Sequence, residues 1–296
     1  MIQSLSDRVV ITCAITGGAS REHGNVHLPY TPEEMAREAR RAVDAGAAVI
    51  HLHGRDPTTG VGSHAVKHLA PAVAAIRAEV PDVIINMSAG GFASVAERIL
   101  PVQELHPEMA TCALGCYNYA AWAANGGSLE EDRVAGATFA TISEMLTAYA
   151  EIGVVPDLEC YELGHLDNLD VLARLGVPTS GELSFVLGVV GNLAADARHL
   201  VHLVDRLGPN RHWTAIVIDH LRHWQVLAAA VGLGGWIRVG FEDSHWLDSD
   251  TPAITNGQLV DRAVKIVESA GRTTLGCTDA RSVLGVAAST AASART

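Results

Sequence analysis

The segment Ala47-Ala48-Val49-Ile50-His51-Leu52-His53, followed by Gly54-Arg55-Asp56-Pro57, decides how the rest of the chain is interpreted. Its apolar start is typical of a buried β-strand. Because side chains alternate along a strand, His51 and His53 point to one side and Leu52 to the other. Two imidazoles that converge at a strand end suit a divalent metal ion with free positions for chemistry. Local spacing alone leaves open whether these are metal ligands or ordinary polar residues.

Strand-like and helix-like segments alternate along the whole chain. We expect strands over residues 9–16, 47–53, 83–88, 109–112, 154–160, 183–187, 213–218 and 237–239. We expect helices over residues 31–45, 69–79, 94–105, 142–152, 167–175, 194–206, 225–231 and 258–270. Thr31, Pro32 and Glu34 give the first helix a capping box with proline at its first position. Eight such βα units predict an α/β fold, a (β/α)8 TIM barrel.

A doubly wound open sheet is the alternative fold. No Gly-x-Gly-x-x-Gly motif follows the first predicted strand, which disfavours a dinucleotide-binding sheet. No linker or change of composition interrupts the chain, so we expect one catalytic domain over residues 1–286, with a last short helix over 278–284. Residues 287–296 are low in complexity and are expected to form a flexible tail.

Composition narrows the possible partners and the cellular location. The 296 residues carry a formal charge of −12, which disfavours binding to nucleic acid or to an anionic membrane. No apolar run approaches the roughly 20 residues that span a bilayer, and the first residues lack a signal-peptide pattern. The cysteines are scattered without a Cys-x-x-Cys pair, which predicts reduced thiols in a cytoplasmic protein. They are Cys13, Cys112, Cys116, Cys160 and Cys277.

The two lysines bear on the type of chemistry. Lys67 and Lys265 both fall in predicted outer helices. Schiff-base catalysis needs a desolvated lysine in the pocket, so it is disfavoured here. A metal ion is the better electrophile for carbonyl chemistry in this chain.

Polar residues follow the predicted strands at the end where TIM barrels place their active sites. They are Thr16, His51, His53, Asn86, Ser88, Thr111, Glu159, Tyr161, Glu242 and Asp243. The eighth strand closes onto the first, so Glu242 is expected to face the histidines across the mouth and to act as third metal ligand. Asp243 is then available for acid–base work, and Arg238 is placed to hold its charge or a substrate carboxylate.

Each of these assignments has a plainer alternative. Glu242 and Asp243 could belong to a solvated loop or cap a helix, and Ser88 and Thr111 could be capping hydroxyls. For Glu159 a functional role is favoured, because its predicted strand is apolar. A buried carboxylate needs a cation, a hydrogen-bond donor or a proton.

Seven segments together resemble the β-keto acid cleavage enzymes, the family related to 3-keto-5-aminohexanoate cleavage enzyme. The resemblance covers nearly the whole chain. It is carried by residues 11–17 (ITCAITG), 28–34 (LPYTPEE), 51–57 (HLHGRDP), 107–111 (PEMAT), 185–189 (FVLGV), 237–243 (IRVGFED) and 256–260 (NGQLV).

The resemblance implies a zinc-dependent TIM barrel that condenses a β-keto acid with acetyl-CoA to give acetoacetate and a new acyl-CoA. It implies a homo-oligomer, with a tetramer favoured. The family's zinc ligands match His51, His53 and Glu242, its catalytic aspartate matches Asp243 and its assisting arginine matches Arg238. Its substrate-binding residues match Ser88, Thr111 and Glu159.

Two segments depart from the family pattern. The amino-keto-acid member has a glutamate after the first strand, where this chain has Gly17-Gly18-Ala19-Ser20. Ala19 cannot pair with an ammonium group, so we expect a substrate without the amino group of 3-keto-5-aminohexanoate. After the seventh strand, residues 219–224 (DHLRHW) stand where relatives have a glycine-rich loop. This difference makes the prediction that CoA binds at this loop less secure than the metal site.

Two other function classes compete with this interpretation. An amidohydrolase-like zinc hydrolase also uses a His-x-His strand end, but it needs further histidines after strands five and six and commonly a bridging lysine. A binding barrel without turnover is the other candidate. The retained set of His51, His53, Glu242, Asp243 and Arg238 argues against it.

Overall fold

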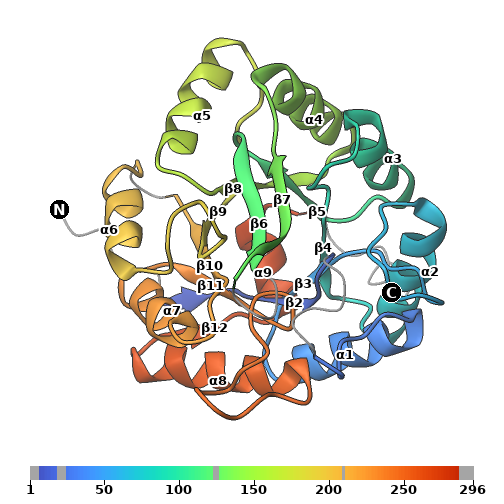
Figure 1. Ribbon diagram of the computed structural model, residues 1–296, viewed down its shortest axis with the longest axis vertical. Helices are drawn as coiled ribbons and strands as arrows, with labels where there is room; N and C mark the ends of the chain where they lie inside the picture. The colour runs from blue at the N-terminus through green and yellow to red at the C-terminus, as the bar shows by residue number, and fades with distance from the viewer. Residues whose placement is uncertain (1–6, 19–24, 123–126, 209–210, 287–296) are drawn as a thin grey trace.

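The computed structural model describes residues 7–18, 25–122, 127–208 and 211–286 (Figure 1). Eight parallel strands close into a barrel in the order β10-β11-β2-β3-β4-β5-β8-β9, and helices surround it. The predicted (β/α)8 TIM barrel is therefore confirmed. The barrel strands are β2 (Ile11–Thr16), β3 (Val49–Leu52), β4 (Ile84–Met87), β5 (Met109–Ala113), β8 (Val155–Cys160), β9 (Glu182–Leu187), β10 (Trp213–Val217) and β11 (Trp236–Val239).

The outer helices begin and end close to the predicted positions. The capping box of α1 forms as expected, since Thr31 and Glu34 each accept from the other's backbone N–H. A second capping box, Ser94 with Glu97, starts α3. The helices are α1 (Pro32–Asp44), α2 (Val66–Glu79), α3 (Val95–Leu105), α4 (Phe139–Ile152), α5 (Gly164–Arg174), α6 (Ala197–Asp205), α7 (His223–Gly232), α8 (Asn256–Ser269) and α9 (Cys277–Leu284).

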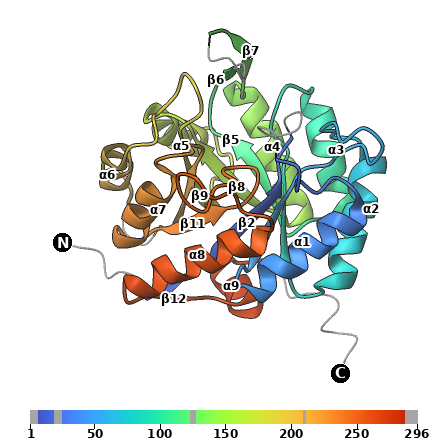
Figure 2. The ribbon, with the colours of Figure 1, turned by 60° about the horizontal axis from the view of Figure 1, so that its bottom comes forward.

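The end of the barrel where the strands begin is closed by the last elements of the chain. Helix α9 packs beneath the barrel, where Arg281 donates to the carbonyl of Val83 at 2.9 Å and to Glu108 at 3.0 Å (Figure 2). Strand β1 (Arg8–Val9) pairs with β12 (Thr273–Thr274) nearby. Among the residues that the structure describes, no helix is long and apolar enough to cross a membrane.

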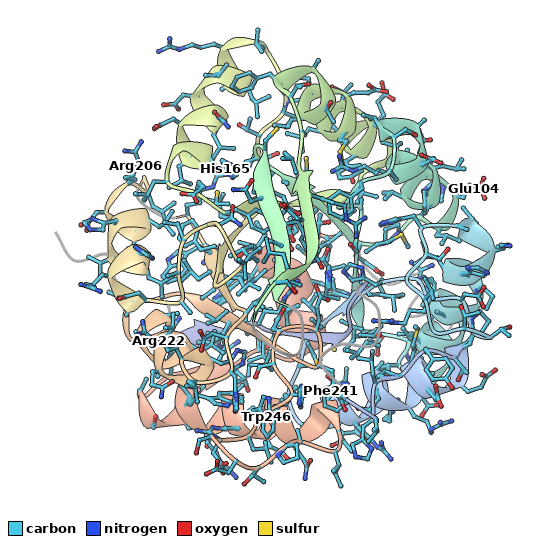
Figure 3. All side chains as sticks on the ribbon, in the orientation of Figure 1. Glu104, His165, Arg206, Arg222, Phe241 and Trp246 are labelled. Carbon is cyan, nitrogen blue, oxygen red and sulfur yellow. The ribbon has the colours of Figure 1, made fainter. Side chains whose placement is uncertain are left out.

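An antiparallel hairpin inserted between β5 and α4 stands over the opposite end of the barrel. It consists of β6 (Tyr117–Trp122) and β7 (Leu129–Ala135), and it projects beyond the strand ends (Figure 2). His165 of α5 ties its base down through a 3.2 Å hydrogen bond with the carbonyl of Cys116 (Figure 3). This hairpin was not among the strands predicted from the sequence, although the alternation at Tyr117 and Tyr119 is a strand pattern.

The middle of the barrel interior is polar. Asp157 accepts from Asn86 at 2.7 Å and from Ser184 at 2.5 Å, and Thr214 donates to Glu182 at 3.0 Å. Burial, the main cause, raises the pKa of Asp157 and raises that of Glu182 to about 8. This polar layer lies inside the barrel toward the end where the strands begin, beside Leu284 of α9.

Candidate active site at the barrel mouth

His51, His53 and Glu242 meet where β3 and β11 end. The Nε2 atom of His51 lies 3.4 Å from Glu242 Oε2, and that of His53 lies 3.4 Å from Oε1. Within the described ranges this is the one group of three or more His, Cys, Asp or Glu residues arranged to hold a metal ion, with ligand atoms within 4.8 Å of one another. Only β2 separates β3 from β11, so Glu242 contacts the histidines directly.

Two glycines let the backbone bring these side chains together. Gly240 has φ +140°, and a Cβ there would lie 2.2 Å from the carbonyl oxygen of Ala14. That close approach allows Glu242 N to donate to the same carbonyl at 3.2 Å. At Gly18, a Cβ would lie 2.6 Å from Nδ1 of His53. Glycine at position 240 therefore allows the backbone to direct Glu242 toward the histidines. Glycine at position 18 leaves room for the His53 ring.

Arg238 on β11 joins the two carboxylates that follow its strand. Its guanidinium donates to both oxygens of Asp243, at 2.9 and 2.6 Å, and to Glu242 Oε1 at 3.0 Å. The side chains of Arg238 and Asp243 are buried. The expectation that Arg238 holds the charge of Asp243 matches this geometry. Asp243 is not free, however, because both of its oxygens are engaged.

The charges around the site set the protonation of its groups. Burial lowers the pKa of His51 well below its ordinary value, and the charge of nearby Glu242 only partly offsets this effect. Burial opposes ionisation of Glu242, yet Arg238 and the two histidines hold its pKa well below the usual range. Burial raises the pKa of Asp243 to about 6 despite Arg238. A neutral imidazole and an ionised carboxylate are the forms that bind a metal ion.

These donors fit a divalent metal ion such as Zn²⁺. Glu242 Oε2 is buried without a hydrogen-bond partner and faces Nε2 of His51. Two imidazole nitrogens and one carboxylate form a ligand set found in catalytic zinc sites, with a further position for substrate or water. The geometry therefore supports the metal assignment, and the residues present are those that would hold the ion.

The other predicted site residues lie on neighbouring strand ends. Ser88 follows β4 and is buried, and Thr111 on β5 accepts from Ala89 N at 3.0 Å. Glu159 on β8 accepts from the Tyr161 hydroxyl at 3.2 Å. Burial, followed by the charge of Asp157, raises the pKa of Glu159 to about 8, so its carboxyl group is protonated at neutral pH.

A buried asparagine that the sequence analysis gave no role fixes the loop after β11. Asn256, at the start of α8, accepts from Phe241 N at 3.0 Å and donates to Ile15 O at 3.2 Å. Glu38 of α1 accepts in turn from Asn256, at 2.7 Å from its backbone and 3.0 Å from its side chain. Asn256 thus ties the residue before Glu242 to the end of β2. In the sequence, the one indication of a role for Asn256 was its position in segment 256–260, which resembles the family.

Of the two segments that depart from the family pattern, the structure describes residues 219–224. Ala19 lies outside the described residues. In the segment 219–224, Asp219 caps the turn by accepting from Leu221 N and Arg222 N, and His220 stacks on Trp246 with ring centroids 4.3 Å apart. This segment is therefore held by its own contacts at the mouth.

The structure does not support an amidohydrolase-like site. That site would need histidines after β8 and β9 and commonly a lysine. The histidine after β8 is His165, whose Nδ1 accepts from Tyr161 N and whose Nε2 contacts Cys116 O. Both lysines, Lys67 and Lys265, are exposed on outer helices, as predicted.

A closed parallel barrel with a histidine–carboxylate cluster at the carboxyl ends of its strands defines a TIM-barrel enzyme. Comparison with known proteins gives its family. The family model for the beta-keto acid cleavage enzyme matches residues 8–286. The chain belongs to this family, whose members act on β-keto acids.

Individual relatives agree with this assignment. The chain is 35% identical to a 3-keto-5-aminohexanoate cleavage enzyme of Fusobacterium nucleatum, over 95% of this chain and 99% of the relative. It is 31% identical to a 3-dehydrocarnitine:acetyl-CoA trimethylamine transferase of Rhizobium meliloti, over 94% and 96% respectively. The solved complex of ObcA with oxaloacetate shares the fold, with a TM-score of 0.69 and 20% identity over 88% of this chain and 67% of that one.

Proposed function

We propose that this chain condenses a β-keto acid with acetyl-CoA and releases acetoacetate and a new acyl-CoA. The observation that carries the proposal is the cluster of His51, His53 and Glu242 beside the Arg238–Asp243 pair, in a chain of this family. The use of acetyl-CoA is supported by relatives named for it, such as the Rhizobium meliloti transferase.

In this proposal His51, His53 and Glu242 hold Zn²⁺. When bound, the metal supplies Lewis acidity that polarises the carboxylate and ketone oxygens of the substrate and so acidifies the carbon between them. The residues contribute by their protonation and position. His51 is neutral because it is buried, and Glu242 is ionised because Arg238 and the histidines surround it.

Asp243 is proposed to take the proton from the carbon between the two carbonyl groups. Arg238 holds both oxygens of Asp243, so one of these hydrogen bonds must open before the carboxylate can reach the substrate. Arg238 then stays bound to Glu242 and keeps its position. The substrate carbanion attacks the acetyl carbonyl of acetyl-CoA and forms the new carbon–carbon bond, while the CoA thiolate leaves.

The released thiolate completes the exchange. It attacks the former ketone carbon of the substrate, and the original carbon–carbon bond breaks to give the new acyl-CoA and the acetoacetate carbanion. Asp243 returns its proton to that carbanion, so no proton is gained or lost. No oxidant or reductant is needed.

Ser88, Thr111 and Glu159 are proposed to bind the substrate. The Thr111 hydroxyl accepts from Ala89 N, which orients it and leaves its own hydrogen to be donated. Ser88 offers a hydroxyl beside β3, the strand that carries His51. Glu159, protonated at neutral pH, can donate a hydrogen bond to a substrate oxygen without adding charge. The absence of a glutamate at Ala19 supports a substrate that lacks the amino group of 3-keto-5-aminohexanoate.

The test is to incubate the zinc-loaded protein with acetyl-CoA and a panel of β-keto acids, and to measure acetoacetate and acyl-CoA. We expect the two products in equal amounts for at least one acid. No product from any acid, together with hydrolysis of an amide or a lactone, would overturn the proposal. Light scattering of the purified chain tests the proposed homo-oligomer, for which a tetramer is expected.

A further inference from the structure

A second buried cluster lies at the barrel mouth, and it is apolar. We call it the apolar arc, and it is separate from the main hydrophobic core of the barrel and helices. Tyr119 and Ile218 are half-buried and pack against it. Its members are Ala113, Tyr117, Ala135, Tyr161, Val186, Val189 and Ile216.

The side chains of Val186 and Ile216 in the apolar arc face the inside of the barrel, as the alternation along their strands shows. Asp157, Ser184 and Thr214 line a small cavity inside the barrel, so these positions face inward. Side chains two residues further along a strand face the same way. Glu159, Val186 and Ile216 therefore form the next layer toward the mouth, on β8, β9 and β10.

The apolar arc lies opposite the metal-binding cluster. Its strands β5, β8, β9 and β10 are consecutive in the barrel, whereas β11 and β3 carry Arg238, Glu242 and the histidines. A β-keto acid whose carboxylate and ketone oxygens face the metal cluster directs its remaining chain away from that cluster. The apolar arc is the surface on that side.

Among the described residues, no member of the apolar arc carries a charged side chain. Its titratable members are Tyr117 and Tyr161, and burial, the main cause, raises the pKa of both. Glu159 is the acidic group beside it, and its raised pKa keeps it protonated at neutral pH. A substrate ammonium placed against the apolar arc would exchange its hydration for aliphatic and aromatic side chains, which is costly.

The hairpin forms a roof over the apolar arc. The ring of Tyr117 on β6 stacks on that of Tyr161 with centroids 3.6 Å apart and planes within 5°. On the hairpin's side toward the β4–α3 connection, Phe92 contacts Tyr119 and lies under the Arg133 guanidinium. The mouth is thus polar on one side and enclosed by aromatic and aliphatic groups on the other.

We propose that the apolar arc receives the substituent on the ketone carbon of the substrate, and that this substituent is uncharged and mainly apolar. Val186 and Ile216 are the residues that select it, with the Tyr117–Tyr161 pair covering it. This assignment rests on the proposed function and narrows its substrate class.

The test compares two acids of one shape, 3-keto-5-aminohexanoate and 3-keto-5-methylhexanoate, in which a methyl group replaces the ammonium. Turnover with acetyl-CoA and calorimetric binding to the zinc-loaded protein are both measured. We expect the methyl compound to be preferred by about 100-fold in kcat/KM and also to bind more tightly. Val186→Asp places a carboxylate in the apolar arc and is expected to reverse the preference.

Two further variants keep this test decisive. Val186→Thr, which is nearly isosteric, should lower the preference by about threefold if Val186→Asp does not fold. Val171→Asp, on the exposed face of α5, should leave the preference unchanged. Preference of the wild type for the ammonium compound, or an unchanged preference in folded Val186 variants, would overturn the assignment. Discrimination in binding without acetoacetate from any acid would instead count against the proposed function.

Discussion

The two sides of the barrel mouth are built from opposite chemistry. The polar arc, which consists of His51, His53, Arg238, Glu242 and Asp243, is held by charge and hydrogen bonds. The apolar arc is held by packing and ring stacking beneath the hairpin. Under the two proposals above, the polar arc activates the part common to all β-keto acids and the apolar arc selects the variable chain.

Removing a ligand of the polar arc should have the largest effect. His51→Ala leaves two of the three donors, so we expect stoichiometric zinc to be lost and kcat/KM to fall by more than about 100-fold. Metal content by elemental analysis and acetoacetate formation are the measurements. His202→Ala, on the exposed surface of α6, is the matched control. Full zinc retention in the His51 variant would refute the ligand assignment.

Changing the proposed base should separate chemistry from metal binding. Asp243→Asn keeps the shape of the side chain but cannot take a proton, so we expect kcat to fall by about 10²–10⁴-fold while zinc stays bound. Asp205→Asn at the exposed end of α6 should leave both unchanged. Wild-type turnover in the Asp243 variant would show that another group removes the proton.

The protonated carboxyl beside the apolar arc should appear as a pH dependence of stability. The folded chain holds the Glu159 proton up to about pH 8, whereas the unfolded chain releases it near 4.5. The folded state therefore binds more protons between these values, and this group lowers stability as pH rises through that window. Glu159→Gln removes this loss, which is at most about 1.4 kcal/mol per pH unit.

Urea denaturation at pH 5, 6.5 and 8 measures the effect. The free energy of unfolding of Glu159→Gln relative to wild type should rise along this series. Glu104→Gln, on the outer surface of α3, should follow the wild type (Figure 3). A constant difference between Glu159→Gln and wild type would mean that Glu159 is ionised in the folded chain.

The smallest effect is expected from the roof of the apolar arc. Tyr117→Leu keeps an apolar side chain but removes the ring stack with Tyr161, at a cost of about 0.5–1.5 kcal/mol in unfolding free energy. We expect KM for the β-keto acid to rise while zinc content stays constant. Val134→Ala changes an exposed side chain of the same hairpin that is not part of the apolar arc, and it should leave KM nearer the wild-type value. Equal changes in both variants would assign the effect to the hairpin as a whole.

Much of the polar arc was predictable from the sequence. The alternation His51-Leu52-His53 and the neighbouring carboxylates Glu242 and Asp243 are local patterns, and the barrel frame placed both at one mouth. The pairing of both Asp243 oxygens with Arg238 was not predictable, because it depends on side-chain geometry. Nor was the role of Asn256, which links segments separated by more than 200 residues.

By itself the sequence determined the eight βα units, the helix caps and the residue types of the His51, His53 and Glu242 cluster, because these follow from periodicity and from interactions a few residues long. The tertiary structure alone decided that the hairpin covers one side of the mouth and that Tyr161, Val186 and Ile216 converge beneath it. These side chains come from different strands. Their convergence depends on closure of the barrel and on long-range packing, which no local pattern encodes.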